Sequence, residues 1–87
     1  MPEIVVYTKP FCPYCHRALA LLEKKGAKVT EIEAGFDANL RREMITRSNG
    51  RATYPQIFIG DRHVGGCDDL MALDRAGQLD PLLADAA

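Results

Sequence analysis

Cys12-Pro13-Tyr14-Cys15 separates an apolar run at Glu3 to Tyr7 from a stretch with helical periodicity at Tyr14 to Lys25. The β-branched and aromatic residues of the first segment predict a short buried strand. Apolar residues at i, i+3, i+4 and i+7 predict an amphipathic helix in the second segment, which ends at Gly26. Cys12 is then the N-cap residue, and Pro13 is the first helical residue, where a missing N–H is tolerated.

This placement makes the two cysteines chemically different. Cysteines at helix N-termini have pKa values lowered from about 8.5 into a range of roughly 3.5 to 7.5. The Cys12 sulfur can accept from the N–H groups of Tyr14 and Cys15, lies at the positive end of the helix dipole, and has Lys9 three residues upstream. Cys15 lies inside the helix on its apolar side, and we expect it to be less exposed. The pattern predicts an attacking Cys12 and a resolving Cys15.

Two other interpretations of the cysteines stay open. Small core cysteines would leave the Pro-Tyr insert at a strand-to-helix junction unexplained. Zinc is the stronger alternative, because His63 and Cys67 are separated by three residues and form a three-cysteine, one-histidine set with Cys12 and Cys15. Against zinc, Cys15 would have to leave the apolar face of its helix, and Gly65-Gly66 predicts a turn rather than a rigid knuckle.

Length and composition favour one small cytoplasmic domain, residues 1–87, with an economical core. A net charge of −1, with acids and bases interspersed, gives no case for binding nucleic acid or an anionic membrane surface. Met1-Pro2-Glu3 lacks a basic leader, and the apolar run after it is too short to span a membrane. Three cysteines, an odd number, favour a transient catalytic Cys12–Cys15 bond over a structural disulfide framework.

After the first helix the pattern predicts a strand, a loop and a second helix. The strand covers residues 28–33 and the loop covers residues 34–38. The helix that follows ends at Asn49-Gly50. Its apolar stripe consists of Leu40, Met44, Ile45 and Ser48. Its solvated side is expected to consist of Arg41, Arg42, Glu43 and Arg47.

A hairpin and a third helix complete the pattern. Gly60-Asp61 is a two-residue turn signal between strands predicted at 56–59 and 62–64. The helix begins after Gly65-Gly66, carries two aspartates in its first turn, where the dipole favours acidic residues, and ends at about Ala76. A short apolar cap is expected from Leu79, Leu82 and Leu83. The predicted order is β-α-β-α-β-β-α, an α/β fold.

Four short motifs follow one another along the chain. They are Tyr7-Thr8-Lys9, Cys12-Pro13-Tyr14-Cys15, Thr53-Tyr54-Pro55-Gln56-Ile57-Phe58-Ile59 and Gly65-Gly66-Cys67-Asp68-Asp69-Leu70. In this order they resemble the glutaredoxin family, most closely its short, single-domain dithiol members of bacterial type, over nearly the whole chain. The resemblance implies a thioredoxin-like fold, in which helices flank a four-stranded mixed sheet.

The resemblance also implies an activity, that of a monomeric glutathione-dependent thiol-disulfide oxidoreductase. Its substrates are protein–glutathione mixed disulfides and protein disulfides. Glutathione is its co-substrate, and no tightly bound cofactor or metal is expected. Electrons come from NADPH through glutathione reductase.

A glutathione site is implied as well. Lys9 faces the glycine carboxylate, with Arg41 and Gln56 as helpers. Asp68 and the first amides of the last helix hold the γ-glutamyl end, because a carboxylate attracts ammonium and a helix N-terminus attracts carboxylate. The other residues implied for this site are Tyr14, Thr53, Tyr54, Pro55 and Cys67.

Two of these positions need comment. Pro55 corresponds to the family's cis-proline, which turns the backbone of Tyr54 outward to pair with the cysteine of glutathione like an added strand. The family usually has valine where Tyr54 stands, so substrate preference is left open here. Cys67 is expected to be a small helix-start residue, with a reactive third thiol as the alternative. His16 and His63 are expected on the surface without a role.

Two further functions stay open beside the zinc module. Some glutaredoxins bridge a [2Fe-2S] cluster between two protomers through the first active-site cysteine and glutathione, and Pro13 weighs against this role. Thioredoxin is the other alternative. The absence of Trp before Cys12, the short chain and the implied glutathione contacts favour glutathione as reductant.

Overall fold

The computed structural model describes residues 3–84. The elements are β1 (Ile4–Thr8), α1 (Pro13–Lys24), β2 (Val29–Glu33), α2 (Ala38–Arg47), β3 (Gln56–Ile59), β4 (Arg62–Gly65), α3 (Cys67–Arg75) and α4 (Leu79–Ala84). The predicted order is confirmed as far as α3, and the apolar cap expected at its end is a further short helix, α4. None of the helices within residues 3–84 is long and apolar enough to cross a membrane.

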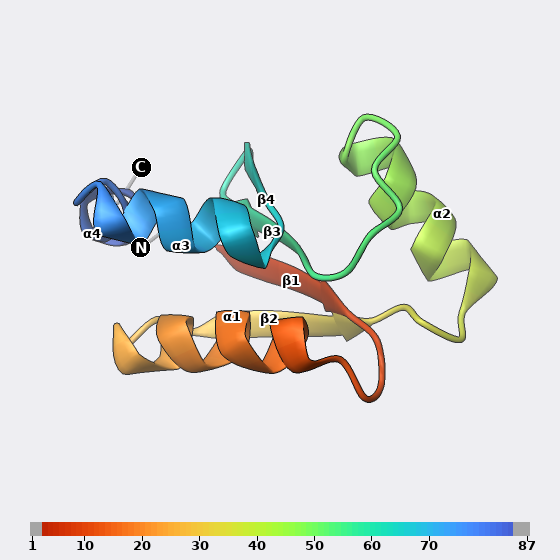
Figure 1. The fold of residues 1–87 in the computed structure, drawn as a ribbon. Helices are drawn as coiled ribbons and strands as arrows, with labels where there is room; N and C mark the ends of the chain where they lie inside the picture. Colours follow the sequence, from red (N-terminus) through yellow and green to blue (C-terminus); the bar gives the residue numbers. More distant parts are fainter. Residues whose placement is uncertain (1–2, 85–87) are drawn as a thin grey trace.

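The four strands form one mixed sheet in the order β2-β1-β3-β4. β1 runs parallel to β2 and antiparallel to β3, and β3 pairs with β4 as an antiparallel hairpin. Helices cover both faces of this sheet (Figure 1). The predicted thioredoxin-like architecture, a four-stranded mixed sheet flanked by helices, is confirmed.

Alternation along β1 divides the core into two clusters. Ile4 and Val6 face α1, α3 and α4, where they pack with Leu22 and Leu70 among others. Val5 and Tyr7 face α2, in the second cluster. A strand whose residues are all buried, as in β1, is expected at the centre of a sheet that is covered on both faces. Both α1 and α3 begin at the end of the sheet where β1 ends, so their N-termini lie near each other (Figure 1).

Two exposed side chains of α2 also contact the sheet. Glu43 and Arg47 are exposed, as expected for the solvated side of this helix, and both also reach the buried hydroxyl of Tyr7. The hydroxyl of Tyr7 donates to Glu43 Oε2 at 2.6 Å, and Arg47 donates to Tyr7 Oη at 2.9 Å. The Arg47 guanidinium also lies 4.3 Å from the centre of the Phe58 ring. A fully buried tyrosine needs polar partners for its hydroxyl, and long side chains at the edge of a helix can supply them.

Candidate active site

Cys12 caps α1 as predicted. Its backbone is extended, Pro13 is the first helical residue, and the Cys12 sulfur accepts from the N–H of Cys15 at 3.2 Å. Two amides were expected to donate to this sulfur. Within the described residues, Cys15 alone does so, and Tyr14 does not. The sulfur therefore lies at the positive end of α1, in a position that favours the thiolate.

The two cysteines are equally buried, and burial has a clear effect on the pKa of Cys15. Cys15 was expected to be the less exposed sulfur, but Cys12 is 4% exposed and Cys15 is 3% exposed, so both are buried. Burial, followed by the hydrogen bond with Cys12, raises the pKa of Cys15 to about 12. Cys15 is therefore a protonated thiol at neutral pH, as suits a resolving cysteine that reacts second.

The raised pKa predicts a pH dependence for alkylation of Cys15. In a Cys12→Ser variant, iodoacetamide should modify Cys15 slowly at pH 7, because burial, the main cause of the raised pKa, remains when Cys12 is replaced, and a thiol with a raised pKa has a small thiolate fraction. The rate should rise about tenfold per pH unit between roughly pH 8 and 10, since the thiolate fraction does so below the pKa. Peptide mass spectrometry separates Cys15 from Cys67. A Cys15 rate at pH 7 equal to that of Cys12 in the unaltered protein would contradict the assignment.

An open cavity lies between the start of α1, the segment before β3 and the start of α3. Its wall includes six residues that the resemblance implied: Tyr14, Thr53, Tyr54, Pro55, Cys67 and Asp68. Its other wall residues are Arg51, Gly66 and Asp69. The Tyr54-Pro55 peptide bond is cis, as expected. Three segments that are far apart in sequence therefore form one site next to Cys12.

The two aspartates at the start of α3 differ in their contacts. Asp69 Oδ2 accepts from the N–H of Gly66 at 2.9 Å and from Arg51 at 3.2 Å. The bond from Gly66 is the main cause that lowers the pKa of Asp69, with Arg51 adding to it. Asp68 is exposed and makes no hydrogen bond or ion pair with any residue of the described part of the chain. Asp69 thus stabilises the helix start, and the carboxylate of Asp68 is exposed and unpaired within residues 3–84.

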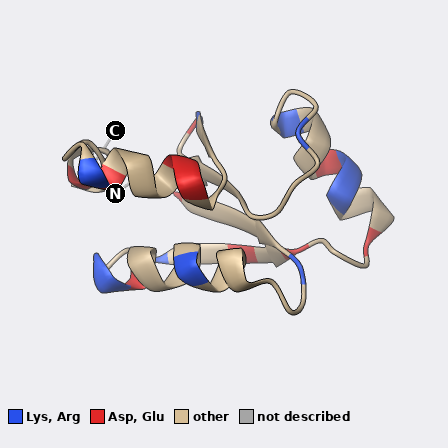
Figure 2. Cartoon of the chain, in the orientation of Figure 1, with Lys and Arg blue, Asp and Glu red and all other residues tan. Residues whose placement is uncertain are grey.

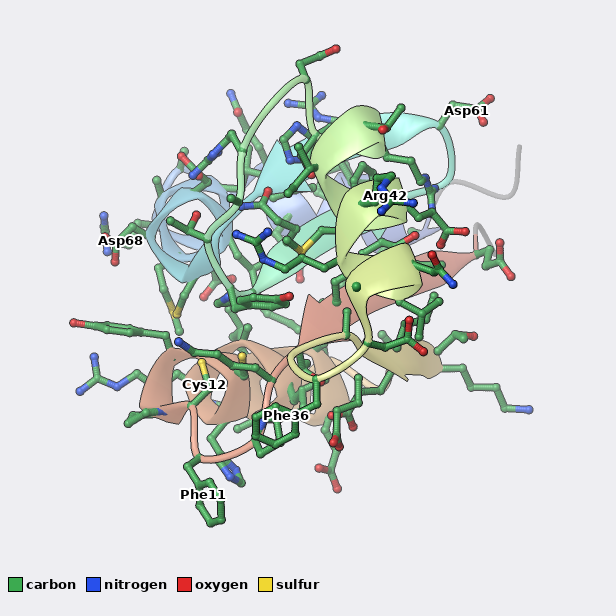
Figure 3. All side chains as sticks on the ribbon, turned by 90° about the vertical axis from the view of Figure 1, so that its right-hand side faces the viewer. Phe11, Cys12, Phe36, Arg42, Asp61 and Asp68 are labelled. Atoms are coloured by element: carbon green, nitrogen blue, oxygen red, sulfur yellow. The ribbon has the colours of Figure 1, made fainter. Side chains whose placement is uncertain are left out.

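The charge around the cavity is mixed. Acidic residues lie at the start of α3 (Figure 2), and the basic residue Arg51 lines the same cavity. Figure 3 views the molecule from the end where α1 and α3 begin, and Cys12 and Asp68 lie on the same side of this view. A ligand with both positive and negative groups suits such a surface better than a simple anion does.

Neither of the two predicted catalytic cysteines lines the cavity itself, and three of the residues implied for glutathione binding do not line it either. Lys9 is exposed, with its Nζ 5.8 Å from the centre of the Tyr54 ring, so it lies next to Tyr54 without lining the cavity. Arg41 is an exposed residue of α2. Gln56 is fully buried, and its amide nitrogen donates to the carbonyl and hydroxyl oxygens of Thr53 at 3.0 and 3.1 Å. Its side chain therefore meets Thr53 and not the open cavity.

Tyr54 forms a bulky wall that is held at its tip. Its hydroxyl donates to the carbonyl of Ala34, in the segment between β2 and α2, at 3.2 Å. A valine at this position could make no such bond. The tyrosine, in place of the usual valine, therefore connects the segment before β3 to the segment between β2 and α2.

Cys67 lies at the start of α3 and is buried. Burial, followed by the charge of Asp68, raises the pKa of the Cys67 thiol, which makes it a weak nucleophile at neutral pH. This agrees with a small helix-start residue. The zinc interpretation required His63 to meet the three cysteines, but Nε2 of His63 contacts Gln56, 2.7 Å away, and residues 3–84 hold no cluster of three or more potential metal ligands.

The sequence reasoning missed Arg51 and the role of His63. Arg51 has one local signal, a positive charge two residues before the Thr53 motif, but its pairing with Asp69 joins positions 18 residues apart. His63 was expected on the surface, yet it is half-buried against Gln56 and Phe58. No spacing in the sequence indicates either contact, because both depend on how β3, β4 and α3 meet.

A buried dithiol at the start of the first helix of a thioredoxin-like fold, beside a cis-proline and a cavity, defines a thiol-disulfide oxidoreductase site. A family model described as Glutaredoxin matches residues 4–64. Glutaredoxin 3 of Escherichia coli K12 is 58% identical over 83 residues, which cover 95% of this chain and 99% of the relative. The chain belongs to the glutaredoxin family.

Solved structures agree with this assignment. The solution structure of a glutaredoxin from Brucella melitensis is 58% identical, with a TM-score of 0.83, and the match covers 95% of this chain and 89% of that one. The crystal structure of a buckwheat glutaredoxin–glutathione complex is 34% identical, with a TM-score of 0.84, and the match covers 94% of this chain and 76% of that one. Members of the family are glutathione-dependent oxidoreductases.

Proposed function

We propose that this glutaredoxin reduces protein–glutathione mixed disulfides with Cys12 as the nucleophile. The Cys12 thiolate attacks the glutathione sulfur, so that a Cys12–glutathione disulfide forms and the protein leaves as a thiolate. A second glutathione thiolate then attacks the glutathione sulfur of this intermediate. Glutathione disulfide leaves and Cys12 is again a thiolate. The N-terminus of α1 stabilises the negative sulfur at the start and the end of this cycle.

Cys15 takes part when the substrate is a protein disulfide. Cys12 attacks one substrate sulfur and forms a mixed disulfide, and the other substrate sulfur leaves. Cys15 then loses its proton and attacks Cys12, which releases the reduced protein and forms the Cys12–Cys15 disulfide. Two glutathiones reduce this bond and leave as glutathione disulfide. The buried, protonated Cys15 beside Cys12 supports this order of events.

The cavity beside Cys12 is proposed to hold the glutathione moiety. The backbone of Tyr54 faces its cysteine, and Asp68 pairs with its γ-glutamyl ammonium, while the first amides of α3 meet the adjacent carboxylate. Thr53 and Tyr14 form further parts of the cavity wall, and Cys67 contributes a small side chain to it. Lys9, which lies next to the Tyr54 ring, is proposed to attract the glycine carboxylate, with Arg41 as a more distant positive charge.

The polypeptide half of the substrate is proposed to lie on an apolar rim beside Cys12. Phe11 and Phe36 are 97% and 88% exposed, and Tyr14 is 54% exposed. Figure 3 shows Phe11 and Phe36 close to Cys12 in that view. Gly35 packs against Lys9 and Pro10, which brings the Phe36 segment next to the Phe11 segment. Exposed aromatic side chains of this kind favour contact with other proteins.

We propose glutathione reductase and NADPH as the source of electrons. We also propose a cytoplasmic location and a monomer of one domain, residues 1–87. The odd number of cysteines and the need for a reduced thiol pair support this location. No tightly bound cofactor is part of the proposal. The iron-sulfur alternative is tested by the colour of protein purified without oxygen in the presence of glutathione.

The observation that carries the proposal is the capped sulfur of Cys12 at the start of α1, the same helix that contributes Tyr14 to a cavity with a cis-proline wall. A coupled assay tests it directly. The mixed disulfide of glutathione and cysteamine is supplied with glutathione, glutathione reductase and NADPH, and NADPH oxidation is followed at 340 nm. The purified protein should accelerate this oxidation in proportion to its concentration, and an unchanged rate would refute the proposed function.

A further inference from the structure

A continuous line of contacts runs from β4 to the wall of the cavity. Nε2 of His63 lies 2.7 Å from Oε1 of Gln56. The amide nitrogen of Gln56 donates to the carbonyl oxygen of Thr53 at 3.0 Å and to its hydroxyl oxygen at 3.1 Å. Thr53 lines the cavity together with Tyr54 and Pro55. The two partners behind the wall are polar, although Gln56 is fully buried and His63 is half-buried.

The donor and the acceptor of each hydrogen bond follow from the groups that meet, because a carbonyl oxygen can only accept. The carbonyl of Thr53 can only accept, so the NH₂ group of Gln56 must face Thr53. The oxygen of Gln56 then faces His63, and an amide oxygen also only accepts. Nε2 of His63 must therefore carry a hydrogen and donate it. The side-chain amide of Gln56 uses both of its hydrogens and its oxygen, so this buried group has all of its partners.

The imidazole of His63 is held in place by its other contacts. His63 and Phe58 are paired residues of β4 and β3. Their rings are stacked, with centroids 4.8 Å apart and planes inclined by 26°. Burial, with the positive charge of Arg51 adding to it, lowers the pKa of His63, so the ring is neutral at pH 7. A neutral ring in a fixed orientation provides a single well-placed N–H donor.

We propose that His63 is a positioning residue for the glutathione site, acting through Gln56 on the Thr53–Pro55 wall. This inference rests on the proposed function, because the wall matters only if glutathione binds there. Gln56 reaches back over Tyr54 and Pro55 to hold Thr53, so it sets the direction of the backbone on which the glutathione cysteine is proposed to pair. His63 in turn fixes the amide of Gln56. Neither side chain lines the cavity or touches Cys12.

The contact with Gln56 also leaves the hydroxyl of Thr53 free to donate a hydrogen bond to a ligand. Because the hydroxyl oxygen of Thr53 accepts from Gln56, its own hydrogen is left to point elsewhere. Thr53 lies on the cavity wall, and a carboxylate of glutathione would be a suitable acceptor. The loss of His63 should therefore weaken glutathione recognition and leave the reactivity of Cys12 unchanged.

Two substitutions separate the hydrogen bond from the packing of the ring. His63→Phe keeps an aromatic ring against Phe58 but removes the donor, which leaves the buried oxygen of Gln56 without a partner. His63→Gln removes the ring but retains an N–H donor. In the coupled assay we expect His63→Phe to raise KM for the glutathione–cysteamine disulfide about fivefold, with kcat within about twofold of the unaltered protein. His63→Gln should have a KM close to that of the unaltered protein.

The outcomes are distinct. If the unaltered protein is inactive, the proposed function fails and the His63 variants are not the cause. If it is active and His63→Phe has the same KM, or if both variants raise KM equally, the positioning role of the His63 N–H is overturned. A loss of thermal stability in His63→Phe without a change in KM also overturns it, since the contact would then serve only folding.

A measurement on the unaltered protein gives an independent test. Long-range ¹H–¹⁵N correlation spectra identify the tautomer of each of the two histidines, and His63→Gln assigns the signals of His63. At pH 7 we expect the tautomer with hydrogen on Nε2 and a bare Nδ1. A ring with hydrogen on Nδ1 alone cannot donate to Gln56, and finding it would overturn the proposal.

Discussion

Cys12→Ser is expected to abolish reduction of every disulfide substrate, whereas Cys15→Ser is expected to keep most of the activity toward glutathione mixed disulfides. Cys12 alone caps α1, so its sulfur alone lies at the open N-terminal end of that helix. Removing a nucleophile that forms the covalent intermediate costs at least about a thousandfold in rate. Cys15 is buried and protonated and enters only the dithiol cycle.

Two assays distinguish the variants. The glutathione–cysteamine disulfide reports the cycle that needs Cys12 alone, and a protein disulfide substrate reports the cycle that needs both sulfurs. Cys15→Ser should lose at least about tenfold with the protein disulfide, because no second sulfur resolves the mixed disulfide. Cys67→Ser serves as the control for the loss of a thiol. Serine keeps a small residue of nearly the same size in the cavity wall, so this variant should keep most of the activity in both assays. Equal losses in Cys12→Ser and Cys15→Ser would contradict the asymmetric assignment.

Asp68→Ala should lower kcat/KM for glutathione mixed disulfides by about tenfold or more. The carboxylate of Asp68 lines the cavity and has no partner among residues 3–84, so it is available to the γ-glutamyl ammonium. A well-formed charge-assisted hydrogen bond is strong enough to account for a tenfold change. The rate at which iodoacetamide modifies Cys12 at pH 7 should stay nearly constant, because Asp68 belongs to a different helix from Cys12.

The chain offers a matched control for this charge change. Asp61 lies at the β3–β4 turn, away from Cys12 and Asp68 in Figure 3. Asp61→Ala removes the same charge from the protein and should leave kcat/KM unchanged. If Asp68→Ala and Asp61→Ala have equal kcat/KM values, the proposed γ-glutamyl contact must be withdrawn, and Asp68 is then a residue that only favours the start of α3.

Local signals in the sequence were sufficient for the order of the elements and for the nucleophile. The helical period after Cys12, with Pro13 at the first helical position, predicted the cap that the structure contains. Helix starts and turns depend on backbone groups within a few residues, so they are visible in a short window of sequence. The resemblance to glutaredoxins added the cis-proline at Pro55 and five other wall residues, none of which periodicity alone could have indicated.

Only the tertiary structure decided which polar groups meet. Asp68 and Asp69 are equivalent in the sequence as acidic residues of a first helical turn, and the contact with Arg51 assigns Asp69 to the helix start. Gln56 turns away from the open cavity because the carbonyl of Thr53 and the ring of His63 lie on either side of its amide.

The same reason explains two contacts and one exposure that the sequence did not indicate. Glu43 and Arg47 are exposed, as the spacing of a solvated helix face predicts, yet both also bind the buried hydroxyl of Tyr7. Cys12 follows a loop and was expected to be the more exposed sulfur, but it is as buried as Cys15. The sequence by itself determined the elements, their order and the reactive sulfur, because these depend on neighbours along the chain. Burial and hydrogen-bond partners depend on neighbours in space, which only the packed sheet and helices supply.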